Sequence, residues 1–140
     1  MADMRKFFFR EKISLEWLST KNWSPDNLVS RGNLSKDLKK MKVLFVGAGA
    51  LGSMLSETFV RSGVIQLDIV DSDILEMGNL TRHSLTATDI GKYKATRMEK
   101  KLTESFIHYR GKGFNMTVEE FIKKQDFNMN EYDVIIETTG

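Results

Sequence analysis

A glycine-rich turn between an apolar run and an amphipathic segment constrains the fold of this chain more than any other feature. Residues 43–71 read VLFVGAGALGSMLSETFVRSGVIQLDIVD. Gly47 permits a tight strand-to-helix turn, Gly49 lets a phosphate approach the backbone, and Gly52 lets the helix pack close to the strand. The helix start then presents unpaired N–H groups and the positive end of its dipole to an anion. The segment is typical of a nucleotide-binding β-α-β unit.

The second strand of this unit ends in an acid. Asp71 lies 24 residues beyond Gly47, near the spacing at which a carboxylate accepts hydrogen bonds from ribose hydroxyls. We therefore predict an adenosine-nucleotide site, although the motif does not say which nucleotide binds. Its predicted residues are Gly47, Gly49, Gly52 and Asp71.

The remaining pattern predicts an α/β fold, a Rossmann-like doubly wound parallel sheet. Apolar runs buried on both faces and right-handed crossovers place helices on each side of such a sheet. In the first helix, a stripe of Leu51, Met54, Leu55, Thr58 and Phe59 is expected to face the core. Strands are expected near 42–47, 65–70, 114–118 and 132–137, with helices near 50–61, 92–106 and 119–123.

Two regions differ in character. Residues 1–41 are expected to form an N-terminal helical extension or the tail of a preceding domain, with a helix starting at Ser24-Pro25. Residues 42–140 are expected to form the nucleotide-binding portion. Because a doubly wound domain usually continues beyond a strand like 132–137, we expect the chain to be the front portion of a longer, truncated domain.

Composition excludes several classes of function. The chain is 41% hydrophobic and 29% charged, which excludes a disordered or membrane-spanning protein. Its 21 basic and 19 acidic residues do not favour nucleic acid as a partner. Without cysteine there is no disulfide, thiolate metal site or thiol nucleophile, and we expect a cytoplasmic protein. His83 and His108 lack a metal-ligand spacing, so surface or polar roles are expected.

The segment after the second strand carries three further motifs in order. They are Asp71-Ser-Asp73, Asn79-Leu-Thr-Arg82-His83 and Ile90-Gly-Lys-Tyr-Lys94-Ala95. This combination resembles the adenylating family that includes ThiF, MoeB, HesA and the ubiquitin-activating enzymes. The resemblance covers roughly residues 42–140, and few other families share these motifs at these distances.

The resemblance implies ATP-dependent activation of a ubiquitin-like or sulfur-carrier protein, whose C-terminal carboxylate attacks the α-phosphorus of ATP. Arg82 and Lys94 would hold the triphosphate and stabilise charge on the transferring group, because two negative groups must meet there. Asn79 would donate to a phosphate or to the attacking carboxylate. Asp71 would take the ribose hydroxyls, and Asp73 would support the nucleotide or Mg²⁺ bound to it.

One departure from the family pattern concerns the metal. The family's last strand usually leads to an aspartate that binds magnesium, and that position is Gly140 in this chain, with Glu137 three residues earlier. The metal is then held differently, through Asp73 or Glu137, or adenylation is weakened or lost. Family members commonly form homodimers in which a partner arginine reaches ATP, and Arg31 precedes the first strand at a matching place. Some bacterial family members carry an Arg-His pair like Arg82-His83. In those proteins the adenylating domain is fused to a domain that resembles ubiquitin-conjugating enzymes.

Two other functions stay open at this point. A nicotinamide- or flavin-linked oxidoreductase would use Asp71 on the unphosphorylated ribose of NAD, but it has no need of Arg82 and Lys94. A non-catalytic module would keep the nucleotide-binding fold as a scaffold for a partner.

Overall fold

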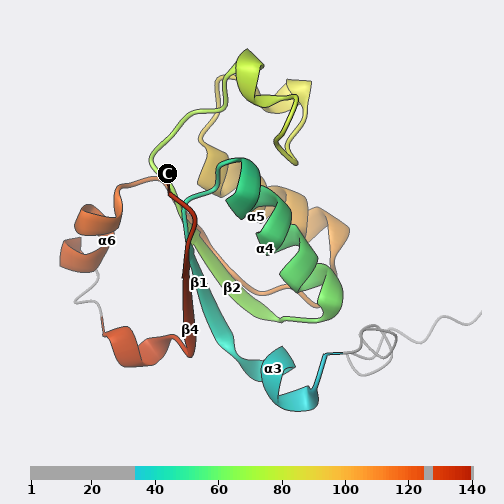
Figure 1. Cartoon of the computed structure of the whole chain (residues 1–140), viewed down its shortest axis with the longest axis vertical. Helices are drawn as coiled ribbons and strands as arrows, with labels where there is room; N and C mark the ends of the chain where they lie inside the picture. Colours follow the sequence, from blue (N-terminus) through green and yellow to red (C-terminus); the bar gives the residue numbers. More distant parts are fainter. Residues whose placement is uncertain (1–33, 125–127, 140) are drawn as a thin grey trace, which may run out of the picture.

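The computed structural model describes residues 34–124 and 128–139, which form a parallel sheet flanked by helices (Figure 1). The strand order is β3-β2-β1-β4, and every pairing is parallel. The chain runs from β1 to β2 and β3 on one side of β1, and it then returns to place β4 on the other side. This change of direction creates a crevice at the carboxyl ends of the strands. The elements are α3 (Lys36–Lys40), β1 (Lys42–Val46), α4 (Ala50–Ser62), β2 (Gln66–Val70), α5 (Lys94–Ser105), β3 (Gly113–Phe114), α6 (Val118–Lys124) and β4 (Val134–Glu137), with single 3-10 turns at Met77–Asn79, Ala87–Asp89 and Met129–Glu131.

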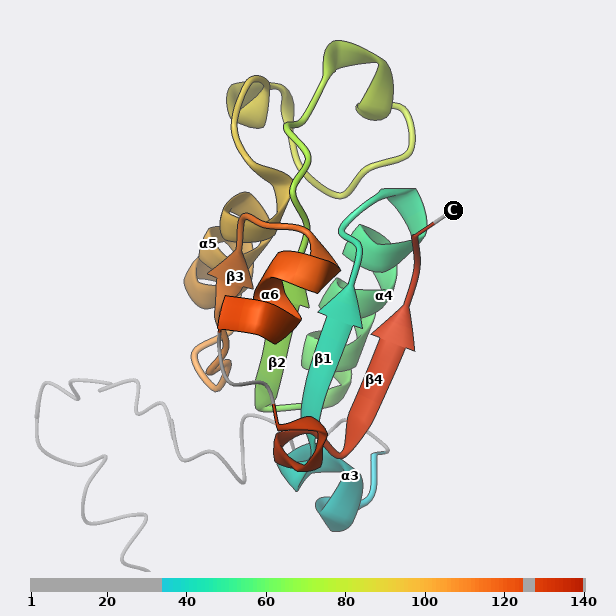
Figure 2. The ribbon, with the colours of Figure 1, turned by 90° about the vertical axis from the view of Figure 1, so that its left-hand side faces the viewer.

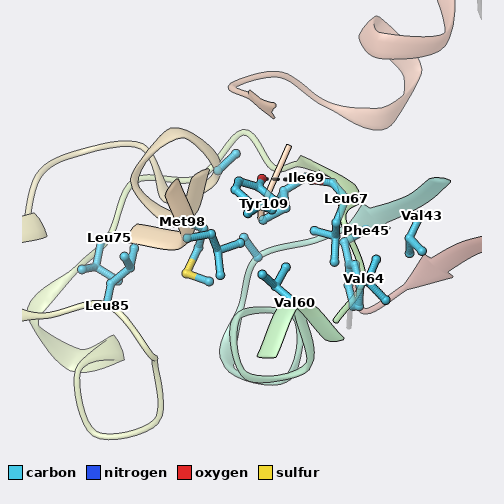
Figure 3. Packing of buried hydrophobic residues seen from close by; sticks show 13 residues of the cluster. Val43, Phe45, Val60, Val64, Leu67, Ile69, Leu75, Leu85, Met98 and Tyr109 are labelled. Carbon is cyan, nitrogen blue, oxygen red and sulfur yellow. Dashed lines mark hydrogen bonds between the residues drawn. The ribbon is translucent and has the colours of Figure 1, made fainter. Parts of the chain in front are cut away.

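Helices cover both faces of the sheet, as predicted. Figure 2 shows α6 in front of the strands and α4 and α5 behind them. Alternate strand residues point to opposite faces, so Phe45 and Leu67 pack with Met98 of α5 (Figure 3). On the other face, Leu44 and Val70 share a smaller core with Phe121 of α6. The doubly wound α/β fold expected from the sequence is confirmed.

The predicted core stripe of α4 was wrong at three of its five residues, whereas Leu55 and Phe59 are partly buried against the core. Leu51 and Met54 are 58% and 53% exposed, and Thr58 is exposed as well. Small side chains take the buried face instead, because α4 lies so close to the sheet that larger ones do not fit. The buried residues of α4 are Gly52, Ser53, Ser56 and Val60.

Two further expectations need correction or fall outside the described residues. A buried strand was expected near 132–137, but Ile135 of β4 is 41% exposed, and within the described residues β4 lies at the edge of the sheet and pairs only with β1. The predicted helix start at Ser24-Pro25 lies outside the described residues. The described α3 has Ser35 as its N-cap, whose hydroxyl accepts from the Leu38 N–H.

One buried carboxylate connects all four strands. Asp68 of β2 accepts hydrogen bonds from the Lys112 N–H, just before β3, and from the Tyr132 hydroxyl, just before β4, both at 2.8 Å. The ammonium of Lys42, at the start of β1, lies 4.0 Å from the same carboxylate. These contacts fasten the amino ends of the strands together.

No helix among the described residues has the length and apolar character needed to cross a membrane.

Candidate functional site: the cleft beside the glycine turn

The turn after β1 is fixed by hydrogen bonds to its backbone. The Gly47 N–H donates to the Val70 carbonyl at 2.8 Å. From the end of β4, the Thr138 hydroxyl donates to the carbonyls of Val46 and Gly47, at 3.2 and 2.9 Å. Gly47 has φ +98°, which favours glycine. The turn is therefore ordered before any ligand arrives.

Gly49 and Gly52 stand in different surroundings. A Cβ on Gly52 would lie 2.1 Å from the Gly47 carbonyl oxygen, so only glycine allows α4 to approach the turn this closely. A Cβ on Gly49 would meet nothing within 4 Å. Gly49 is the N-cap of α4 and makes no side-chain cap. The structure thus gives Gly52 a packing role and leaves open space beside Gly49.

Asp71 closes the turn from the second strand. One carboxylate oxygen accepts from the Ala48 N–H at 2.6 Å, and the other accepts from the Asp73 N–H at 2.7 Å. Each carboxylate oxygen can accept a further hydrogen bond. Asp71 can therefore hold the turn and still accept from ribose hydroxyls.

A cleft of about 340 Å³ opens at the carboxyl ends of the strands. Its lining includes four residues named from the sequence, Gly47, Asp71, Asp73 and Glu137. It also includes residues 116–119, which follow β3 and which sequence reasoning missed because they form no recognisable motif. Ligands of open parallel sheets bind at this end, so we take this cleft as the candidate site.

A larger cavity, of about 630 Å³, lies at the opposite end of the sheet. Lys42 and Gln66, at the amino ends of β1 and β2, line it together with Asp68. None of the predicted site residues contributes to its lining. Its size alone does not make it the nucleotide site.

Lys94 reaches the edge of the cleft through an ion pair. It begins α5 and is only 7% exposed, and its ammonium lies 2.8 Å from the carboxylate of Asp73. Its N–H also donates to the Asp73 carbonyl at 2.9 Å. The structure thus buries Lys94 and points its charge at a cleft residue.

Asn79 and Arg82 lie together in the loop between β2 and α5. The Asn79 side-chain oxygen accepts from the Glu76 N–H at 3.0 Å, and the Arg82 N–H donates to the Asn79 carbonyl. Arg82 is exposed, and its guanidinium makes no hydrogen bond or ion pair to the described residues. Neither residue lines the cleft. The Asn79 amide group and the Arg82 guanidinium therefore keep donors available for a ligand that extends beyond the cleft.

His83 is buried against the glycine turn. Its Nε2 lies 2.6 Å from the Ala48 carbonyl oxygen, while its Nδ1 accepts from the Leu85 N–H at 3.1 Å. These partners require the tautomer protonated at Nε2. Burial is the main cause that lowers the His83 pKa below its ordinary value, and it outweighs the opposing hydrogen bond to Ala48. The sequence predicted a surface or polar role, and the structure shows a polar one in a buried position. No local signal in the sequence predicted this burial, because the partner Ala48 lies 35 residues earlier.

The cleft residues fit a magnesium ion that arrives with the nucleotide. Among the described residues, no three His, Cys, Asp or Glu side chains form a group that could hold a metal by itself. Asp73 and Glu137 both line the cleft, and Mg²⁺ is commonly held by one or two carboxylates plus phosphate oxygens. Gly140, and Arg31 with its predicted role across a dimer, lie outside the residues that the structure describes.

Comparison with known proteins agrees with this geometry. The sequence profile of the ThiF family matches residues 23–139. The chain belongs to the ThiF family. This confirms the resemblance on which the sequence interpretation depended.

Three curated relatives illustrate the range of the family. An ATP-dependent ubiquitin transferase-like protein Cap2 of Enterobacter hormaechei is 37% identical over 126 residues, which are 90% of this chain and 21% of the relative. A probable molybdopterin-synthase adenylyltransferase of Porphyra purpurea is 36% identical and covers 73% of this chain and 26% of its own. The ThiS adenylyltransferase of Bacillus subtilis is 41% identical over 48% of this chain and 21% of its own. The chain spans only about a fifth to a quarter of the length of these relatives.

Solved structures share the fold. The crystal structure of Escherichia coli MccB with ATP superposes with a TM-score of 0.65 at 23% identity, over 81% of this chain and 32% of that chain. The E. coli dehydratase TcdA in complex with AMP gives a TM-score of 0.64 at 17% identity, over 80% of this chain and 43% of its own. At these identities the likeness shows the fold alone.

Proposed function

We propose that this chain supplies the nucleotide-binding half of an enzyme that uses ATP to adenylate the C-terminal carboxylate of a ubiquitin-like or sulfur-carrier protein. The observation that carries the proposal is the open backbone at Gly49 next to a cleft lined by Asp71 and Asp73. Lys94, paired with Asp73, adds a cation at its edge. The adenylyltransferases among the relatives support the same reaction.

The cleft offers a separate contact for each part of ATP. Asp71 has carboxylate lone pairs left for the ribose hydroxyls. Residues 116–118 line the side of the cleft next to β3, where an adenine would lie beyond the ribose. The unpaired N–H groups at the start of α4 would receive the phosphates, helped by the helix dipole.

In the proposed reaction, an oxygen of the carrier carboxylate attacks the α-phosphorus. The bond from this phosphorus to the oxygen that bridges to the β-phosphate breaks, and pyrophosphate leaves with the electron pair. Lys94 and Arg82 would stabilise the negative charge that accumulates on the phosphoryl oxygens. Asn79 would orient the carboxylate or a phosphate through its amide group.

Magnesium fits this arrangement as an ion bound to the triphosphate. When bound, it would neutralise part of the phosphate charge. Asp73 and Glu137, two of the carboxylates that line the cleft, would hold it. Asp73 would then exchange part of its contact with Lys94 for the ion, which frees that ammonium for a phosphate.

ATP–pyrophosphate exchange by the full-length protein, with a ubiquitin-like or sulfur-carrier protein added, tests the proposal directly. We expect exchange that depends on the carrier, and ATP binding without measurable binding of NADH in parallel calorimetric titrations. Binding of NADH in preference to ATP would favour an oxidoreductase. ATP binding without exchange for any carrier would favour a scaffold module.

A further inference from the structure

Each carbonyl of the glycine turn has a hydrogen-bond donor that holds it in place. Thr138 donates to the carbonyls of Val46 and Gly47, and the carbonyl of Ala48 lies 2.6 Å from Nε2 of His83. In a trans peptide the C=O and N–H groups point to opposite sides, and the described residues contain no cis peptide. With the Ala48 carbonyl directed at His83, the N–H of Gly49 must point away from that ring.

The Gly49 N–H is free to receive a ligand. It makes no hydrogen bond within the described residues, and a Cβ on Gly49 would meet no atom within 4 Å. If the peptide between Ala48 and Gly49 turned over, a carbonyl oxygen would take the place of this donor. Such an oxygen would repel a phosphate, so the orientation of this one peptide decides whether the turn attracts or rejects an anion.

We propose that His83 is a positioning residue, whose Nε2–H holds the Ala48 carbonyl so that the Gly49 N–H is presented to a phosphate of the nucleotide. The inference rests on the ATP binding proposed above. His83 touches neither the nucleotide nor the carrier in this account. It acts through the peptide that joins Ala48 to Gly49.

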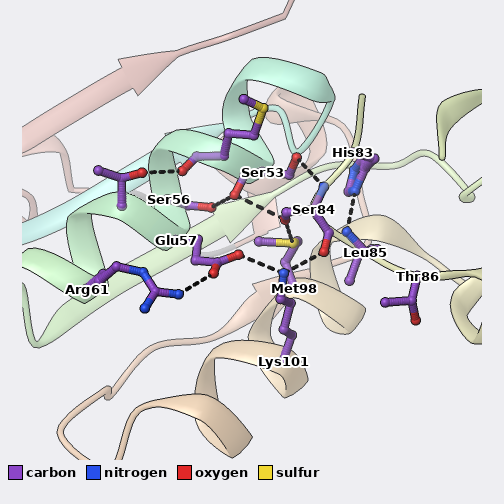
Figure 4. A network of polar contacts seen from close by, with 12 residues as sticks. Ser53, Ser56, Glu57, Arg61, His83, Ser84, Leu85, Thr86, Met98 and Lys101 are labelled. Carbon is purple, nitrogen blue, oxygen red and sulfur yellow. Dashed lines mark hydrogen bonds and ion pairs between the residues drawn. The ribbon is translucent and has the colours of Figure 1, made fainter. Parts of the chain in front are cut away.

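His83 is itself held by its chain neighbours. The Leu85 N–H fixes the ring through Nδ1, and Ser84 bonds with Ser53 of α4 through its N–H and its hydroxyl, both at 3.3 Å. Lys101 of α5 bridges the Ser84 carbonyl and the carboxylate of Glu57 (Figure 4). Residues 83–85 are thus fastened to two helices, and the imidazole has little freedom to release the turn.

The tautomer can be observed directly in the unmodified protein. Nitrogen-15 NMR of the His83 ring should show a protonated Nε2 and an unprotonated Nδ1 at neutral pH. The opposite tautomer would leave Ala48 without its donor and would overturn the inference. This measurement needs no variant, so it stands even if substitutions of His83 prevent folding.

Binding measurements on full-length His83→Phe separate positioning from a general structural role. The variant keeps a planar aromatic ring but loses both hydrogen bonds, so we expect about tenfold weaker binding of ATP. Adenosine, which has no phosphate, should bind it within twofold of the wild type. An equal loss for both ligands would show a structural role, and unchanged ATP affinity would show no role.

His108→Phe is the matched control. Its Nε2 lies 2.8 Å from the Val60 carbonyl at the other end of α4, so the same kind of contact is lost away from the turn. We expect wild-type affinity for both ligands. A wild type that binds no ATP would remove the proposed function together with this inference, whereas His83→Phe with wild-type ATP affinity would remove this inference alone.

The pH dependence of ATP binding adds a readout that packing would not change. The charged groups facing the ring are Lys94 and Lys101 of α5 and Asp71 after β2. Protonation would place a second N–H opposite that of Leu85, so the wild type should lose its advantage over His83→Phe as pH falls through the lowered His83 pKa. Because ATP gains protons equally in both titrations, its own protonation does not change the ratio of the wild-type affinity to the His83→Phe affinity. A ratio of affinities that stays constant through the pH at which nitrogen-15 NMR shows the His83 ring gaining its second proton would contradict the inference.

Discussion

Single glycines of the turn have separable roles although they belong to one motif. Gly52 is enclosed by the carbonyl of Gly47 and the side chain of Thr138, whereas Gly49 faces open space. Packing and ligand access are therefore controlled at positions only three residues apart. Substitutions by alanine should separate stability from binding.

We expect Gly52→Ala to lower the free energy of unfolding by about 3 kcal/mol, because the new methyl group would overlap the Gly47 carbonyl. Gly49→Ala should change it by less than about 1 kcal/mol, since φ is −68° and no atom is near. The same variant should bind ATP tenfold or more weakly, because its methyl group occupies the approach of the phosphate. Urea unfolding and calorimetry measure the two effects. A stable Gly52→Ala would contradict the packing role.

The two cations of the loop and helix start are expected to act in catalysis. Arg82→Ala and Lys94→Ala should each reduce ATP–pyrophosphate exchange by about 100-fold or more, and Arg82→Ala should leave stability within about 0.5 kcal/mol because the residue is exposed. Arg110→Ala and Lys100→Ala are the controls, since both side chains are exposed and lie outside the cleft. Wild-type exchange by Arg82→Ala would refute its assigned role.

At the scale of elements, the loop between β2 and α5 is held in place by an ion pair. Asp89, which ends a 3-10 turn, is buried, and its carboxylate contacts Arg97 of α5 and the N–H and hydroxyl of Thr86. Burial by itself would raise the Asp89 pKa, but these hydrogen bonds outweigh it and hold the pKa below its ordinary value. The loop that carries Asn79 and Arg82 thus depends on a charge located at its far end.

Asp89→Asn should lower the free energy of unfolding by about 3 kcal/mol at pH 7, because it leaves Arg97 without its anionic partner. Since the Asp89 pKa is lower in the folded state, its contribution is fully present above the unfolded-state pKa and is lost as pH falls through the folded-state value. Urea unfolding from pH 7 to 3 should therefore show a shallower loss of stability in the variant. Glu104→Gln, which breaks the exposed pair with Lys100, should change stability by less than about 0.5 kcal/mol. Equal effects of the two substitutions would contradict this account.

At the scale of the whole molecule, Asp68 joins strands that are far apart in the sequence. Its carboxylate collects donors from the regions of β1, β3 and β4. Burial raises the pKa of Tyr132 above its ordinary value, and the hydrogen bond to Asp68 acts in the same direction. The Tyr132 hydroxyl therefore keeps its proton and remains a donor at neutral pH.

Asp68→Ala should lower the free energy of unfolding by about 1–2 kcal/mol, because it removes the acceptor of the part-buried hydrogen bonds from the Lys112 N–H and the Tyr132 hydroxyl. Glu131→Gln is the control, since it removes an exposed anion 3.6 Å from Lys42, and we expect a change below about 0.5 kcal/mol. Both are measured by urea unfolding. A tolerated Asp68→Ala would mean that the strands are held together without this carboxylate.

Local sequence signals allowed much of the fold and of the candidate site to be predicted. Features that depend on packing between residues far apart in the sequence could not be predicted. The glycines and Asp71 could be placed because each acts within one strand–turn–helix unit. The buried face of α4 could not, since the close approach permitted by Gly52 favours Ser53 and Ser56 over Leu51. The burial of His83 depends on Ala48, 35 residues earlier, and no local pattern announces such a contact.

The hydroxyl of Thr138 has a consequence for the order in which the protein assembles. It reaches back across 91 and 92 residues to the carbonyls that follow the first strand. During synthesis on a ribosome, the first strand emerges long before the residue that fastens its end. The bend that would cradle the nucleotide therefore stays incomplete until β4 has emerged and paired with β1, so a nascent chain that ends before Thr138 could not yet hold the nucleotide firmly.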